Sequence, residues 1–148
     1  MEIKEINPMT VFYRTVQTTL SEMMQYVMTT PLEMYQEAMK EGLKISGPQV
    51  WIYHGMDGNP NTKFTLEIAL PIIKPIKNNL QIKELPAFKC ATIIHKGDWG
   101  NLKNSYEKII SEIYSSGNSM NKICREVYAH VETPESENNI TEIQIGIN

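Results

Sequence analysis

Two glutamates in the C-terminal third of the chain stand where a half-buried strand has little reason to keep a charge. Glu126 lies in the alternating segment 124–128, and Glu142 lies in the segment 141–143 a short way downstream. Both are flanked by apolar residues, and acidic side chains are seldom buried unless they are paired. Two carboxylates on neighbouring strands, with aromatic residues beside them, therefore predict a pocket for something positively charged.

The chemistry of such a pocket follows from poor solvation of the carboxylates. A bound organic cation would restore the counter-charge that water no longer supplies. Nearby aromatic rings could each add a cation–π attraction of about 0.5–2 kcal/mol; the candidates are Trp51, Tyr53, Trp99 and Tyr128. Aromatic rings and carboxylates impose few directional constraints on an alkylated cation, so we expect the site to accept many ligands.

Simpler interpretations of these residues stay open. Glu126 could pair with Arg125 or with a lysine on an exposed sheet face, and Glu67 could mark a solvated strand edge. Trp99 could be a packing anchor at the start of a helix. Tyr106 lies on an apolar helix face and is expected in the core.

The elements that must position these residues are visible as changes in periodicity. Alternating or β-branched segments predict strands at residues 9–17, 50–54, 64–71, 87–95, 123–131 and 140–147. Apolar residues three and four apart predict helices at 21–28, 31–41 and 99–116. A dense turn signal at 57–61 predicts a hairpin between the strands at 50–54 and 64–71, and residues 71–79 are expected to be a linker.

Several residues indicate where the helices begin and end. Thr30 to Glu33 is expected to form a capping box with Pro31 at the first helical position, and Asp98 is expected to cap the helix that follows it. Gly42 and Gly117 are expected to end their helices.

The two halves of the chain repeat each other. Residues 3–6 match residues 82–85 at an offset of 79, whereas Tyr53 matches Tyr128 at an offset of 75. Glu67 matches Glu142 at the same offset of 75, which also superposes Trp51 on Glu126. We therefore expect an α+β fold made by tandem duplication of a β-α-β-β module, in one domain of residues 1–148 with repeats at about 1–76 and 80–148.

Strand alternation then assigns faces to the side chains. Val50 and Ile52 suit packing under a helix, so the aromatic and acidic residues are expected to point away from the helices. Two halves related by a pseudo-twofold axis would join these open faces in a groove on the far side of an antiparallel sheet. The residues expected to line it are Trp51, Tyr53, Glu67, Glu126, Tyr128 and Glu142.

At this point the sequence resembles the GyrI-like effector-binding family, which includes drug-binding domains of AraC-type and BmrR-type transcription regulators as well as stand-alone proteins. The matching segments cover nearly the whole chain in order: Gly47-Pro48, residues 95–99, residues 125–128, residues 141–143 and Ile147. The resemblance implies tandem β-α-β-β modules with a ligand site between them. It also implies that Glu126 is the main acid of the pocket, that Glu142 can assist it, and that aromatic residues stack on the ligand.

Composition limits the other functional classes. The formal net charge is −3 and no cluster of lysines and arginines stands out, so we expect no direct contact with nucleic acid. No apolar run approaches the length of a membrane span, and we expect a cytoplasmic protein. Cys90 and Cys124 are expected to be buried, reduced thiols.

Cofactor and catalytic roles are the remaining alternatives. His54, His95 and His130 match no metal-ligand spacing, so neither a metal nor another cofactor is expected. We expect small-molecule binding rather than catalysis. The alternatives are hydrolysis of a strained electrophilic toxin, with Glu126 and Tyr128 as catalytic residues, and an interaction with an unknown protein partner of the gyrase-inhibitor kind.

Overall fold

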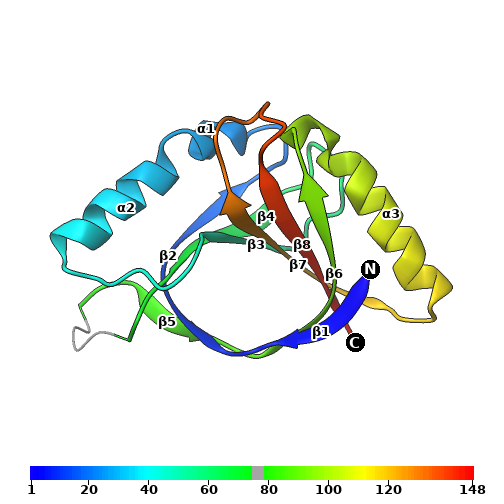
Figure 1. The fold of residues 1–148 in the computed structure, drawn as a ribbon, viewed down its shortest axis with the longest axis horizontal. Coiled ribbons are helices and arrows are strands. Elements are labelled where there is room, and N and C mark those ends of the chain that lie inside the picture. The colour runs from blue at the N-terminus through cyan, green and yellow to red at the C-terminus, as the bar shows by residue number, and fades with distance from the viewer. Residues whose placement is uncertain (75–78) are drawn as a thin grey trace.

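The chain forms one antiparallel sheet of eight strands with two long helices on one side of it (Figure 1). The computed structural model describes residues 1–74 and 79–148. The strands are β1 (Glu2–Ile6), β2 (Met9–Thr18), β3 (Val50–His54), β4 (Phe64–Pro71), β5 (Ile82–Leu85), β6 (Phe88–Lys96), β7 (Met120–His130) and β8 (Ile140–Ile147). The helices are the short α1 (Met24–Val27), α2 (Thr30–Lys40), the 3-10 turn η1 (Trp99–Asn101) and α3 (Leu102–Ser115).

The strand order confirms the duplication. The sheet runs β1-β6-β8-β7-β3-β4-β2-β5, an order that is unchanged when the halves are exchanged end for end. Trp51 and Glu126 are direct partners across β3 and β7, so the pseudo-twofold axis passes between them. The matched segments 3–6 and 82–85 are the two edge strands, and each pairs with the other half, β1 with β6 and β5 with β2. The repeat signal at the shifted offset of 79 thus marks a pair of exchanged strands.

The sheet curls strongly, so both faces of its central strands are covered. Helices α2 and α3 lie outside the curve, while β1 and β5 bend round beneath the central strands (Figure 1). The larger core cluster joins helix residues such as Met34 and Ile109 to the Trp51 face of the sheet. A smaller cluster inside the curve contains Val50 and Ile52. The expectation that Val50 and Ile52 pack under a helix is therefore wrong.

The helix ends agree with the sequence in part. Gly42 and Gly117 have φ values of 70° and 79°, a conformation that costs glycine little, and both follow the ends of their helices as predicted. The side chain of Asp98 accepts a hydrogen bond from the Gly100 amide, as expected for a cap. The capping box does not form, because Thr30 already lies inside α2 and Thr29 at the cap makes no side-chain capping bond.

The predicted linker at 71–79 lies partly outside the described residues. Within the described part, Pro71 is the last residue of β4 and Ile72 makes an isolated bridge to Ile45. Pro75 and Lys77, which suggested the linker, fall in the segment that is not described.

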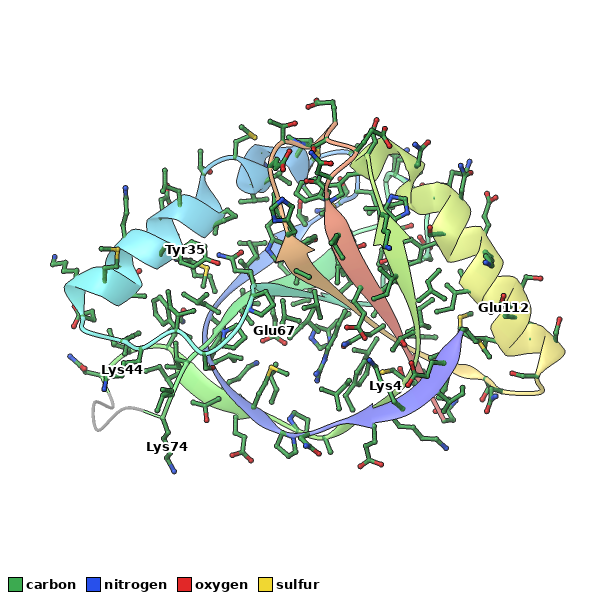
Figure 2. The ribbon with its side chains drawn as sticks, in the orientation of Figure 1. Lys4, Tyr35, Lys44, Glu67, Lys74 and Glu112 are labelled. Carbon is green, nitrogen blue, oxygen red and sulfur yellow. The ribbon has the colours of Figure 1, made fainter. Side chains whose placement is uncertain are left out.

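The exchanged edge strands are each held by an ion pair to the other half. Lys4 on β1 lies 2.7 Å from Glu142, and Lys83 on β5 contacts Glu67. The two pairs correspond under the duplication, because Lys4 matches Lys83 at the offset of 79 and Glu67 matches Glu142 at the offset of 75. Glu67 also lies 2.7 Å from His54. Glu67 and Lys4 both lie inside the curve of the sheet (Figure 2). These glutamates therefore join the two halves.

Acidification tests the ion pair of Glu67. The pKa of Glu67 is lowered from 4.5 to about 2, first by hydrogen bonding with His54 and also by Lys83. Its carboxylate therefore stabilises the fold above about pH 4.5, and this contribution disappears as the pH falls towards about 2. Between these limits, Glu67→Gln should lose less free energy of unfolding than the wild type in urea titrations. The exposed Glu84→Gln is the control, and equal losses in wild type and Glu67→Gln would contradict the assignment.

Candidate ligand-binding site

A large cavity opens between the helices above the central strands β3 and β7. Its volume is about 1310 Å³. Helix α1 and the start of α2 form one wall, and α3 forms the opposite wall. The lining is mostly apolar or aromatic; it includes Leu20, Met23, Val27, Tyr35, Trp51, Tyr53, Met56, Trp99, Leu102, Tyr106, Ile110, Met120, Cys124, Glu126, Tyr128 and Ile145. This is more than enough space for a drug-sized molecule.

The carboxylate of Glu126 lies in the floor of the cavity and is 5 % exposed. Its Oε1 accepts hydrogen bonds from the phenols of Tyr53, at 2.8 Å, and Tyr128, at 2.7 Å. Its Oε2 accepts one from Tyr106 at 2.5 Å. Within residues 1–74 and 79–148, no basic side chain forms an ion pair with it. The charge is therefore held by neutral donors alone.

The three phenols stay protonated at neutral pH. Burial raises the pKa of Tyr53 well above its usual value, and the neighbouring Glu126 carboxylate raises it further. The pKa values of Tyr128 and Tyr106 are also raised well above the usual value, chiefly by burial. Each phenol consequently remains a donor to the carboxylate, which reduces the cost of burying its charge.

Two indoles complete the aromatic wall around Tyr128. The Trp51 ring meets Tyr128 edge-on, with centroids 5.7 Å apart, and the Trp99 ring lies 5.4 Å from it at 53°. The Trp51 Nε1 donates to Gln49 Oε1 at 3.1 Å, and the Trp99 Nε1 donates to Thr141 Oγ1 at 3.2 Å. Because both indole N–H groups are already engaged, the indoles offer a ligand apolar and π surface.

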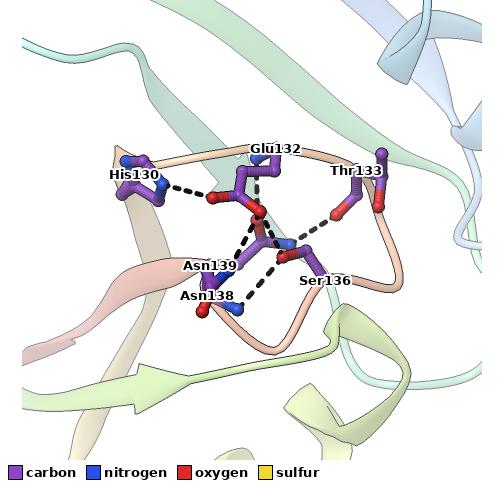
Figure 3. A network of polar contacts seen from close by, with 6 residues as sticks. All are labelled: His130, Glu132, Thr133, Ser136, Asn138 and Asn139. Carbon is purple, nitrogen blue, oxygen red and sulfur yellow. Dashed lines mark hydrogen bonds and ion pairs between the residues drawn. The ribbon is translucent and has the colours of Figure 1, made fainter.

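The loop between β7 and β8 is held by its own polar network (Figure 3), and it begins next to His130 and Val131 in the cavity lining. The fully buried Asn139 accepts from the Glu132 amide at 2.9 Å and donates to the Thr133 carbonyl at 2.6 Å. Hydrogen bonds with His130, and then with Asn138 and Ser136, lower the pKa of Glu132 to about 2. The Trp99 amide donates to the carbonyl of Pro134 in this loop at 3.0 Å. The loop therefore helps to set the position of the Trp99 wall.

Comparison with known proteins agrees with this architecture. The model of the GyrI-like small molecule binding domain matches residues 1–148. The chain belongs to the GyrI-like family. No curated protein sequence matches it significantly.

Solved structures show the same GyrI-like fold. The EcmrR C-terminal domain superposes with a TM-score of 0.80 at 24% identity, covering 99% of this chain and 96% of that one. EcmrR in its complex with DNA superposes with a TM-score of 0.82 at 22% identity over 99% of this chain. This chain spans only 56% of the length of that EcmrR chain. SAV2435 bound to tetraphenylphosphonium superposes with a TM-score of 0.67 at 16% identity, covering 100% of this chain and 94% of that one. A hydrolase from Listeria innocua superposes with a TM-score of 0.62 at 10% identity, covering 99% of this chain and 91% of that one.

This GyrI-like chain brings five of the seven sequence-predicted site residues together around the cavity. They are Trp51, Tyr53, Trp99, Glu126 and Tyr128. Glu67 and Glu142 lie on the opposite face of the sheet, because Glu67 is the cross-strand partner of Ile52 and Glu142 is the partner of Val127. Directly opposed residues share a face. The expectation that both glutamates line the same groove as Glu126 is therefore wrong.

The face of the sheet that carries the cavity also differs from the expectation. The aromatic residues were expected to point away from the helices, but they lie beneath them with Leu66 and Ile68. Trp51 pairs with Ile68, and Tyr53 pairs with Leu66. The expectation failed because the curled sheet buries both faces, so an apolar residue is as well placed inside the curve as under a helix.

Sequence reasoning missed two contributors to the site. Tyr106 was expected in the core, yet it donates to Glu126; a buried phenol on an apolar helix face needs a partner, and this requirement was the available signal. Met23, at the N-cap of α1, and Met24, the first residue of α1, also line the cavity, and α1 has no buried residue.

The three histidines lie apart, each with a different partner. His54 contacts Glu67, His130 contacts Glu132, and His95 lies 2.7 Å from Ser105 Oγ. Among the residues that the structure describes, no three His, Cys, Asp or Glu side chains are grouped to hold a metal ion. Both cysteines are free and buried. Over the same ranges, no helix is both long and apolar enough to cross a membrane.

Proposed function

We propose that this protein reversibly binds lipophilic organic monocations in the cavity, with Glu126 as the counter-charge. The observation that carries the proposal is a buried carboxylate with neutral partners only, set in an aromatic floor. A metal ion or a small ammonium would lose strong hydration on entering such a site. An organic cation with a dispersed charge loses little hydration and gains apolar burial.

Three further features support this ligand class. Trp51 and Trp99 can stack on the apolar body, and cation–π attraction adds about 0.5–2 kcal/mol for each well-placed ring. Of the two acidic residues in the lining, Asp57 is exposed and only Glu126 is buried, which favours a single positive charge. The same fold in SAV2435 has been seen bound to tetraphenylphosphonium.

The test is a pair of ligands with the same shape and opposite charge. Tetraphenylphosphonium and tetraphenylborate carry four phenyl groups each, so their apolar contributions are alike. In calorimetric titrations at neutral pH, we expect the cation to bind at least about 30-fold more tightly, which corresponds to about 2 kcal/mol. Equal affinities would show that the cavity selects apolar bulk alone and would end the cationic proposal.

Hydrolysis is the second candidate, because Glu126 lies within hydrogen-bonding distance of Tyr128 and the Listeria innocua structure of the same fold is a hydrolase. Binding is favoured over hydrolysis because few lone pairs of the carboxylate remain free. Oε1 accepts two phenols and Oε2 accepts a third, which leaves one lone pair for a water or a substrate proton. A cation needs the charge and not the lone pair. Multiple-turnover loss of an electrophilic compound, abolished by Glu126→Gln, would reverse this preference.

A further inference from the structure

The other face of β7 carries a buried cation with unused hydrogen-bond donors. Arg125 is 3 % exposed, and its side chain lies inside the curve of the sheet, on the opposite face from Glu126. Its guanidinium lies 4.1 Å from the centre of the Phe88 ring. The ring face offsets part of the charge, but the N–H bonds lie in the plane of the guanidinium and point past the ring. Nε and Nη1 have no hydrogen-bond partner in residues 1–74 and 79–148.

The acidic side chains near Arg125 are already engaged. Glu67 contacts His54 and Lys83, and Glu142 pairs with Lys4. The exposed Glu2 acts on Lys4 in turn. The field of Glu67 reaches Arg125 without a direct contact. Within residues 1–74 and 79–148, no acidic side chain forms an ion pair with the guanidinium, which is therefore a buried charge without a partner of its own.

The thiol of Cys90 does not supply the missing charge. Burial raises the pKa of Cys90 to about 11, so the thiol is neutral at physiological pH. The duplication places Val50 at the position that corresponds to Arg125, since 125 − 75 = 50, so the fold does not require a charge here. An arginine in this place with two unused donor nitrogens is unusual, because buried donors are nearly always satisfied.

Two more donors stand beside Arg125 in one row across the sheet. Gln144 on β8 is its direct partner, and Thr92 on β6 is the partner of Gln144. Directly opposed residues share a face, so a guanidinium, a carboxamide and a hydroxyl lie next to one another. We propose that Arg125, Gln144 and Thr92 form a site for a small monovalent anion, either a halide or a small carboxylate, inside the curve of the sheet.

The size of the anion follows from burial. Gln144 and Thr92 are each 4 % exposed, so the occupant must be an ion of few atoms that is nearly enclosed. A monovalent ion neutralises the charge of Arg125, whereas a divalent anion would leave an excess negative charge beside Glu67 and Glu142. This anion site is separate from the cavity, because the side chains of Arg125 and Glu126 lie on opposite faces of β7.

Thermal unfolding at constant ionic strength tests the proposal. The wild type is measured in sodium chloride, in sodium formate and in sodium gluconate, whose anion is too large to enter. We expect a melting temperature higher by about 2–4 °C in chloride, in formate or in both than in gluconate. Arg125→Met, which keeps most of the volume, should remove the difference. Arg14→Met, which changes an arginine already paired with Glu33 and Glu37, should retain it.

A second measurement does not depend on any variant. Crystals of the wild type grown in bromide should show an anomalous peak beside the Arg125 guanidinium if a halide binds. Formate electron density at that place, with a melting shift in formate alone, would assign a carboxylate. Equal melting temperatures in the three salts and no anion beside Arg125 would overturn the proposal, as would a chloride or formate effect that Arg125→Met retains.

Discussion

Glu126→Gln is expected to weaken tetraphenylphosphonium binding by about 30-fold or more while leaving tetraphenylborate binding unchanged or stronger. Removing one partner of a buried, hydrogen-bonded charge pair costs about 2–5 kcal/mol, and about 2 kcal/mol corresponds to this fold-change. The glutamine keeps the shape of the side chain, and its amide can still exchange hydrogen bonds with the phenols of Tyr53, Tyr106 and Tyr128. Calorimetry with both ions separates lost charge from lost shape.

The matched control is Glu142→Gln, which removes the same charge from the other face of the sheet. Its carboxylate pairs with Lys4 on the face of the sheet opposite to the cavity. We expect this variant to bind tetraphenylphosphonium within about 2-fold of the wild type, because Glu142 lies on the other face of the sheet and its charge is already compensated by Lys4. A loss that is equal in the two variants would mean that net charge, and not the site, controls affinity.

Tyr106→Phe is expected to lower the free energy of unfolding at neutral pH by about 1.5–3 kcal/mol, the range for a hydrogen bond to a charged group. Its hydroxyl donates to Glu126 Oε2 at 2.5 Å, and no other phenol in residues 1–74 and 79–148 donates to that oxygen. Without it, a buried carboxylate oxygen loses its donor. Urea unfolding followed by circular dichroism measures the change.

A double-mutant cycle with Glu126→Gln isolates this contact. With a neutral amide in place of the carboxylate, Tyr106→Phe should cost only about 0.5–1.5 kcal/mol. Tyr114→Phe is the control on the same helix, since Tyr114 is 66% exposed, and we expect it to change stability by less than about 0.5 kcal/mol. If Tyr106→Phe cost the same with glutamate and with glutamine at residue 126, the phenol would contribute through packing alone.

The duplication explains why the site is asymmetric. The axis passes between Trp51 and Glu126, so one half supplies an indole where the other supplies a carboxylate. The preceding residues on these strands show the same difference on the inner face, where Val50 corresponds to Arg125. At both pairs of corresponding positions, the C-terminal half carries the charged residue and the N-terminal half carries an aromatic or apolar one.

Local sequence patterns determined much of the architecture. Strand alternation, helical spacing and the glycines after α2 and α3 act between residues that are neighbours in the chain, so they can be recognised without tertiary contacts. The repeat also gave the correspondence between Trp51 and Glu126, because an internal duplication preserves order along the chain. The pair at residues 3–6 and 82–85 was visible as a match, but its exchange between halves was not.

Only the tertiary structure decided which face of the sheet carries the cavity and which acids line it. Alternation groups residues by face but does not say which face meets a helix, and a curled sheet buries both. Glu67 and Glu142 resemble Glu126 in the sequence, yet the register places them inside the curve with Lys83 and Lys4. Tyr106 joins Glu126 only because α3 packs over the sheet beside β6, which brings its phenol to the carboxylate. The identity of a buried acid's partners is a long-range property, whereas the sequence pattern reports short-range ones.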